Sequence, residues 1–179
     1  MNLSLVPLAE EHRTPAIDIF NHYVTRSDAS FLDTPVTYAA FDRLRQFADG
    51  FPAFAVVAEG ARVVGFGMLR PHHPMPTFAR TAEISYFLHP DFCRCGAGSL
   101  LLGRLLEDGA KKGITTVLAG ITATNAASLG FHRKHGFVEC GRFKSVLRKN
   151  GRDLDVVWMQ KMLEPQPPAA SGEGPGAVR

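Results

Sequence analysis

The chain has 179 residues, of which 45% are hydrophobic, so it is long enough for one well-buried core and short for two. Its formal net charge of +3 is mildly basic and no run of five like charges is present, which excludes the basic stripe of a nucleic-acid-binding surface and favours a small anionic ligand. No stretch approaches the roughly 18 apolar residues of a membrane-spanning helix, so we expect no membrane partner.

The compartment can be inferred from the cysteines and the N-terminal sequence. Cys93, Cys95 and Cys140 are an odd number, and MNLSLVPLAEEHR lacks the basic leader, apolar core and cleavage site of a secretory signal. We therefore expect a soluble cytoplasmic protein with reduced thiols and no disulfide framework.

The first half of the chain predicts two helices and three strands. Apolar residues recur at spacings of three and four in residues 14–24 and 38–47, which indicates two short amphipathic helices. The valine-rich stretches at 53–59 and 62–69 are joined by a short glycine-containing turn, which is typical of a hairpin. TAEISYFL, residues 81–88, adds a third strand.

The next part predicts a crossover unit. After residues 89–98, leucines recur on one face of a predicted helix of about 14 residues. This helix is expected to end at Gly113. TTVLAGIT, residues 115–122, is typical of a buried strand. Because a strand, a helix and a strand follow one another, the strands that begin at Thr81 and Thr115 should be parallel.

The C-terminal part predicts a helix, a hairpin and a tail. Asn125 is expected to cap a helix that stops at Gly136. Two apolar stretches then flank Asn150-Gly151, a strong signal for the tight turn of a closing hairpin. Residues 164–179 are rich in proline and glycine and are expected to be disordered, which leaves a single domain over residues 1–163 with a mixed α/β (α+β) fold.

A glycine-rich turn, HPDFCRCGAG at residues 89–98, precedes the leucine-rich helix. The first N–H groups of a helix lack internal partners and carry partial positive charge, so such an end binds anions. Gly96 and Gly98 let phosphate oxygens approach the main chain, while Ser99 can add a hydroxyl and Arg94 a charge. The alternative is a merely tight strand-to-helix connection. A Rossmann fingerprint is disfavoured because the third glycine is missing, and a P-loop because no Gly-Lys-Ser/Thr follows.

This turn resembles the acetyl-CoA pyrophosphate loop of the GNAT superfamily of N-acetyltransferases, whose pattern is Q/R-x-x-G-x-G/A. Further segments are similar to the phosphinothricin and methionine-sulfone-type N-acetyltransferases, namely residues 21–37, 81–91, 119–137 and 151–160. The resemblance implies a GNAT fold with a mixed, centrally splayed sheet of about seven strands and about four helices. It also implies acetyl-CoA as co-substrate and a homodimer.

The loop departs from the family pattern, because Cys93 and Cys95 stand where Gln or a basic residue is usual and Arg94 is the remaining cation. Since main-chain amides supply most phosphate contacts, we expect coenzyme A binding to persist. The residues that the resemblance assigns to the cofactor are Phe87, Leu88, Arg94, Cys95, Gly96, Ala97, Gly98, Ser99, Asn125 and Ser128.

Acetyl transfer from a thioester needs a proton acceptor for the amine and stabilisation of the departing thiolate. Glu83 and His132 are the candidates. The pattern alone favours an ordinary solvated strand residue at Glu83 and a helix-surface histidine at His132. The resemblance instead implies that Glu83 is the general base, acting directly or through water, and that His132 assists the leaving thiolate, where many superfamily members carry a tyrosine.

The acceptor site is expected along RPHHPMPTFAR, residues 70–80, whose family counterpart grips an anionic acceptor with basic groups. Met75 and Ala79 stand at positions that are often arginine in close relatives, so the recognition of phosphinothricin itself does not follow. The candidate acceptor residues are Tyr23, Phe31, Arg70, His73 and Arg80, of which the two aromatic residues are as readily explained as core. Adjacent histidines are poor chelators, so no metal is expected.

The leading hypothesis is an acetyl-CoA-dependent N-acetyltransferase that acts on the primary amine of a small amino-acid-like acceptor by direct attack in a ternary complex. The same chemistry on a polyamine, an aminoglycoside or a protein N-terminus is an alternative. A non-catalytic acyl-CoA-binding sensor is another.

Overall fold

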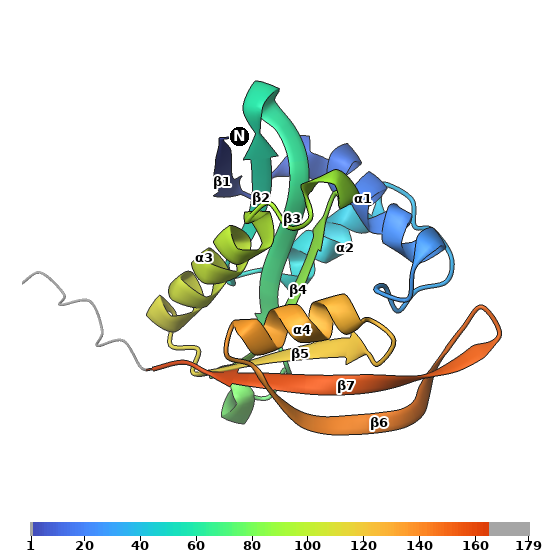
Figure 1. Cartoon of the computed structure of the whole chain (residues 1–179). Helices are drawn as coiled ribbons and strands as arrows, with labels where there is room; N and C mark the ends of the chain where they lie inside the picture. Colours follow the sequence, from blue (N-terminus) through green and yellow to red (C-terminus); the bar gives the residue numbers. More distant parts are fainter. Residues whose placement is uncertain (1, 165–179) are drawn as a thin grey trace, which may run out of the picture.

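The computed structural model describes residues 2–164, so the predicted tail falls almost wholly outside the described residues. Seven strands form one sheet in the order β1-β2-β3-β4-β5-β7-β6 (Figure 1). The elements are β1 (Leu3–Pro7), α1 (Arg13–Arg26), α2 (Ala40–Phe47), β2 (Ala53–Ala58), β3 (Arg62–Pro71), β4 (Thr81–Leu88), α3 (Ala97–Lys111), β5 (Thr116–Thr122), α4 (Ala126–Lys134), β6 (Val138–Lys149) and β7 (Arg152–Met162). The mixed sheet and its helices confirm the predicted fold class.

The sheet divides at its centre. Strands β1 to β4 form an antiparallel meander, and β5, β7 and β6 form a second antiparallel group. The two groups join only where β4 runs parallel to β5, as the crossover predicted, and this pairing is confined to Thr81–Glu83 on β4. In Figure 1 the strands of the first group stand nearly upright and β5, β7 and β6 run across below them. Beyond Glu83 the two strands therefore diverge.

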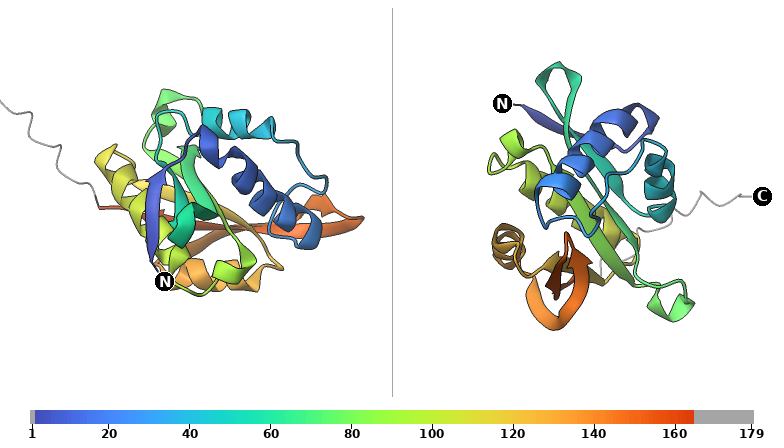
Figure 2. Two further views of the ribbon diagram at one scale, coloured as in Figure 1. Left: turned by 90° about the horizontal axis from the view of Figure 1, so that it is seen from above. Right: turned by 90° about the vertical axis from the view of Figure 1, so that its right-hand side faces the viewer.

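Two hydrophobic clusters cover the two faces of the sheet. On one face the buried leucines of α3, Leu101, Leu102 and Leu105, pack with apolar residues of the central strands. On the other face α1 and α2 pack against β3, mainly through Ile17 and Phe41. Figure 2 shows the helices on opposite sides of the sheet. Each fully buried leucine contributes about 1.5–3 kcal/mol, so these clusters hold the helices against the two faces of the sheet.

Local signals placed most of these elements correctly. Asn125 caps α4, since its side chain accepts from the Ser128 N–H, and Gly113 and Gly136 end helices with φ of +85° and +81°. The β6–β7 turn has positive φ at both Asn150 and Gly151, as expected. Strand β1 was not predicted, because its five residues alternate only weakly between partly buried and exposed.

Candidate active site

The turn that precedes α3 presents an uninterrupted row of main-chain donors. Within residues 2–164 the N–H groups from Arg94 to Ser99 have no acceptor, and the first helical bond is donated by Leu100 to the carbonyl of Gly96 over 3.0 Å. Arg94 and Gly96 adopt left-handed conformations, with φ of +67° and +91°, which turn successive amides to one side. A Cβ added at Gly96 would meet nothing within 4 Å. The turn thus suits a diphosphate.

The edge of β4 beyond Glu83 is the second open stretch of main chain. Since pairing with β5 stops at Glu83, residues 84–88 have no strand beside them on that side. The hydroxyl of Tyr23 donates to the Leu88 carbonyl over 2.6 Å, and burial raises the pKa of this phenol, which keeps it a donor. An extended ligand with amide groups can add to such an edge as a strand would.

His132 lies on the inner face of α4 and is 3% exposed. Its Nδ1 atom is 2.8 Å from the Ser128 carbonyl, which can only accept, so Nδ1 carries a hydrogen. Burial lowers the pKa of this imidazole, which favours the neutral ring and leaves Nε2 as an acceptor.

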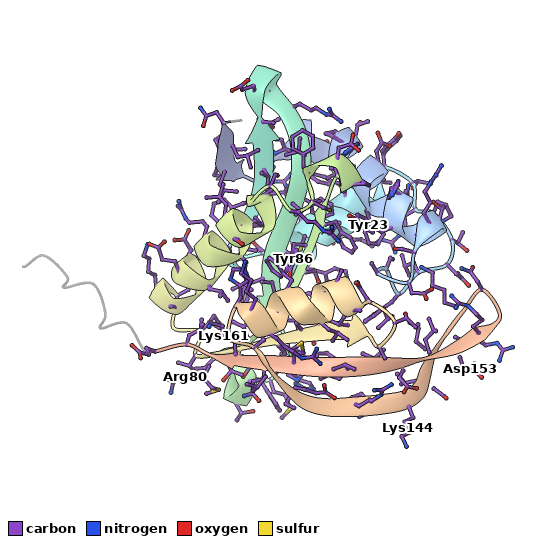
Figure 3. The ribbon with its side chains drawn as sticks, viewed as in Figure 1. Tyr23, Arg80, Tyr86, Lys144, Asp153 and Lys161 are labelled. Carbon is purple, nitrogen blue, oxygen red and sulfur yellow. The ribbon has the colours of Figure 1, made fainter. Side chains whose placement is uncertain are left out.

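Tyr86 supplies the donor for that nitrogen. Its hydroxyl is 3.1 Å from Nε2 of His132, and burial raises the pKa of the phenol. Figure 3 labels Tyr86 on β4 beside α4. The two rings are also stacked, with centroids 5.6 Å apart. Tyr86 and His132 therefore form a hydrogen-bonded pair on the α3–α4 face of the sheet.

Glu83 lies on the opposite face of β4 from Tyr86, since side chains alternate along a strand. Arg70, its cross-strand neighbour on β3, binds one carboxylate oxygen, and Nδ1 of His72 lies 2.8 Å from the other. The Glu83 side chain is 15% exposed. The carboxylate is thus a shielded group, with one donor on each oxygen, at the last paired position before the strands diverge.

Aromatic rings surround this carboxylate group. The His72 ring lies 5.8 Å from that of Phe78 and 6.3 Å from that of Trp158. Trp158 and Phe31 both lie over the bare Cα of Gly120, where an added Cβ would meet them at 3.5 Å and 3.6 Å. We call Phe31, His72, Phe78 and Trp158 the aromatic cluster.

The loop that carries Phe31 is fastened by a fully buried lysine. Lys149, at the end of β6, donates to the carbonyls of Ser27 and Ser30 over 2.7 Å and 2.8 Å. Asp28 in the same loop binds Arg152 of β7. The β6–β7 hairpin therefore fixes the position of one wall of the aromatic cluster.

The structure brings some predicted residues together and separates others. Tyr23, predicted to line the acceptor pocket, packs against Phe87 and lies 3.8 Å from the sulfur of Cys93, near the anion-binding turn. His73 is exposed, packs on Phe78 and accepts from the Met75 N–H. Arg80 is exposed directly ahead of β4 (Figure 3).

Several predicted cofactor residues already have partners. The Ser99 hydroxyl is 3.0 Å from Nε2 of His135, and the Cys95 thiol donates to the Phe92 carbonyl. Ala97 and Gly98 are buried, and a Cβ on Gly98 would lie 3.3 Å from the Phe131 ring. The exposed main chain of this turn, at residues 94–96 and 99, is therefore the part most accessible to a ligand.

Sequence reasoning named His72 only as a possible source of charge for the acceptor, and it did not select Tyr86, Trp158 or Lys149 as site residues. Tyr86 shares a strand face with Ile84, and that alternation could have placed it opposite His132's helix. Trp158 is the single tryptophan, in the second strand of the predicted closing hairpin. The sequence around Lys149 does not indicate its role, since its hydrogen-bond partners lie about 120 residues away in the chain.

Two general features of residues 2–164 bear on function. No helix in that part of the chain is long and apolar enough to cross a membrane. No group of three or more His, Cys, Asp or Glu side chains in the same residues is arranged to hold a metal ion.

Comparison with known proteins agrees with this geometry. Residues 16–137 match the acetyltransferase (GNAT) family. The chain is 30% identical over 164 residues to a phosphinothricin N-acetyltransferase of Streptomyces coelicolor. The aligned region covers 88% of this chain and 94% of that protein. The chain is also 34% identical over 152 residues to an L-methionine sulfoximine/L-methionine sulfone acetyltransferase of Pseudomonas aeruginosa, covering 82% and 87%.

A solved structure supports the cofactor assignment. The structure of yncA from Salmonella typhimurium with its cofactor acetyl-CoA superposes with a TM-score of 0.83 at 28% identity, covering 96% of this chain and 99% of that chain. Acetyl-CoA is thus the co-substrate, and the open amides at residues 94–99 fit its diphosphate. The chain belongs to the acetyltransferase (GNAT) family and is an acetyl-CoA-dependent N-acetyltransferase.

Proposed function

We propose that this enzyme acetylates the primary amine of a small amino-acid-like acceptor by direct attack in a ternary complex. One observation carries the proposal: Glu83 lies on β4, which separates from β5 directly after Glu83 and whose C-terminal end leads into the anion-binding turn. A thioester held along the open edge of β4 and an amine held at Glu83 would meet across that separation without a covalent enzyme intermediate.

The two faces of β4 divide the chemistry between them. On the α1–α2 face, the negatively charged Glu83 marks the place where the acceptor amine loses its proton. On the α3–α4 face, the Tyr86–His132 pair stabilises and protonates the departing thiolate, with His132 acting through the tyrosine hydroxyl that it binds. The main chain of Phe87 and Leu88, together with Asn125 and Ser128 at the start of α4, borders the cofactor.

Arginine and histidine side chains support an anionic acceptor. Arg70 is 40% exposed while it binds Glu83, so its guanidinium keeps free donors for an acceptor carboxylate. His73 and Arg80 add donors along the same segment, and Phe31 adds an apolar wall. Two relatives are named for small amino-acid-like acceptors, which supports the same substrate class.

The test is release of free thiol from acetyl-CoA over a panel of amines. The panel holds methionine sulfone, methionine sulfoximine, phosphinothricin, a polyamine, an aminoglycoside and a peptide with a free N-terminus. Fast release with the first three alone supports the proposal. Release with only the cationic amines or the peptide would reassign the acceptor, and tight acetyl-CoA binding without release would favour a sensor.

We also propose a cytoplasmic homodimer. The three cysteines are free and exposed, which suits a reducing compartment. The outer strand β6 exposes Val138, Phe143 and Val146, an apolar surface that a second copy could cover. Sedimentation equilibrium at micromolar concentration tests the dimer, and a monomer mass would contradict it.

A further inference from the structure

Both oxygens of the Glu83 carboxylate already accept a hydrogen bond, Oε2 from Arg70 and Oε1 from His72, which leaves only part of each oxygen's acceptor capacity for an amine. The Nε2 atom of His72, by contrast, makes no hydrogen bond within residues 2–164. This nitrogen is therefore an unoccupied acceptor beside Glu83, on a more exposed side chain.

The geometry fixes which nitrogen of His72 carries the hydrogen. A carboxylate only accepts, so Nδ1, 2.8 Å from Oε1, is the protonated nitrogen of the neutral ring and Nε2 holds the lone pair. Arg70 prevents the carboxylate from rotating away from the imidazole. A hydrogen bond from the His72 main chain to the Thr81 carbonyl holds the residue at the start of β4.

The surroundings of His72 suit a group that must meet substrate. Its side chain is 31% exposed, about twice the 15% of Glu83, so a ligand can reach the ring more easily than the carboxylate. Phe78 and Trp158 flank the ring within the aromatic cluster. The charged and titratable neighbours are Glu83 on β4, Arg70 on β3 and His73 on the same loop.

We propose that Nε2 of His72 is the atom that takes the proton from the acceptor amine, and that Glu83 is a positioning residue that orients the imidazole and balances its positive charge. This inference rests on the proposed function. A carboxylate bonded to the far nitrogen of a histidine base plays the same part in other enzymes.

The step balances as follows. The acceptor enters as an ammonium ion, and His72 removes one proton and passes it to solvent. The freed nitrogen lone pair forms the N–C bond to the acetyl carbon while the C–S bond breaks. The nitrogen then loses a second proton, which gives the amide product. The thiolate of coenzyme A takes up one proton, so one proton in total is released to solvent.

The first experiment compares His72→Asn with wild type at saturating acetyl-CoA. Asparagine can still donate to Glu83 but cannot take a proton. We expect kcat to fall by about 10²–10³-fold, with the dissociation constant of acetyl-CoA and the thermal midpoint close to wild type. His22→Asn, on the outer helix α1, is the matched control and should keep full activity.

The second experiment asks which group can be replaced from solution. Added imidazole should raise the rate of His72→Ala at least about tenfold. Added formate should raise the rate of Glu83→Ala little. If Glu83 were the direct base, formate would rescue Glu83→Ala and imidazole would not rescue His72→Ala.

The third measurement reads the tautomer and needs no turnover. In Glu83→Gln the amide oxygen must face Arg70, which only donates, so the NH₂ group faces His72 and donates to Nδ1. The ring hydrogen then moves to Nε2, which can no longer accept a proton. ¹⁵N NMR of histidine-labelled protein should show protonated Nδ1 in wild type and protonated Nε2 in the variant, and Asn125→Gln should keep the wild-type pattern at His72.

The outcomes separate the two proposals. A wild-type enzyme that releases no thiol with any amine overturns the proposed function and this inference with it. If the wild type is active, any of three results overturns the role of His72 alone. These are a His72→Asn rate above half of the wild-type rate, rescue of Glu83→Ala by formate, and protonation of His72 at Nε2 in the resting enzyme.

Discussion

The hydroxyl of Tyr86 donates to Nε2 of His132, 3.1 Å away, across the interface between β4 and α4. The direction of this bond follows from the Ser128 carbonyl, which holds the ring hydrogen on the other nitrogen. A neutral histidine in this orientation has no proton of its own to give at Nε2. The phenol is therefore the nearest proton donor that the pair can present to a leaving thiolate.

Replacing Tyr86 with phenylalanine should lower kcat by at least about tenfold, because the ring and its packing stay while the donated proton is lost. The KM for acetyl-CoA should change little. Stopped-time thiol assays at saturating acceptor measure both. Tyr38→Phe is the matched control, since that side chain is exposed and, among residues 2–164, its hydroxyl bonds only Asp18. A Tyr86→Phe enzyme with wild-type kcat would show that the hydroxyl takes no part.

His132 should also make stability depend on pH. Burial lowers the pKa of this imidazole in the folded chain from the 6.5 of an unperturbed histidine. The unfolded chain then binds more protons as the pH falls below about 6.5, so the stability contributed above that pH is lost on acidification.

Urea unfolding of wild type and His132→Gln at pH 7.5 and pH 5.5 measures this contribution. The difference in unfolding free energy between the two proteins should be largest at the higher pH and shrink at the lower one. His22→Gln, as a control, should track wild type at both. An equal difference between wild type and His132→Gln at the two pH values would mean that the imidazole titrates alike in folded and unfolded chains.

Features encoded within a few residues were predictable, and contacts between distant segments were not. The row of amides at residues 94–99 follows from a glycine-rich turn placed before a helix. The pairing of Tyr86 with His132 joins positions 46 residues apart, and neither residue type signals the other. The bond between His72 and Glu83 spans 11 residues and depends on the register of β3 against β4, which a single sequence does not fix.

Replacing Gly96 with alanine should weaken acetyl-CoA binding. The residue has φ of +91°, which an alanine adopts only at a cost of about 1 kcal/mol or more, so the turn should relax and misdirect its amides. We expect the dissociation constant measured by calorimetry to rise several-fold, with the acceptor KM unchanged.

Gly103→Ala is the control for that substitution. Gly103 lies inside α3, where an added Cβ meets nothing within 4 Å and alanine favours the helix. It should bind acetyl-CoA like wild type. If Gly96→Ala also binds like wild type, the left-handed turn is not what presents the donors.

Lys149→Met should separate the acceptor site from the cofactor site. The substitution leaves an unbranched apolar side chain one atom shorter and removes the hydrogen bonds to the carbonyls of Ser27 and Ser30, which should cost about 1–3 kcal/mol of unfolding free energy. Because Phe31 directly follows Ser30, the loosened loop should raise the acceptor KM several-fold and leave the acetyl-CoA KM unchanged. Lys144→Met, at an exposed position of the same strand (Figure 3), should change neither constant. Equal loss of affinity for both substrates in Lys149→Met would mean that the lysine supports the fold as a whole and not the acceptor wall.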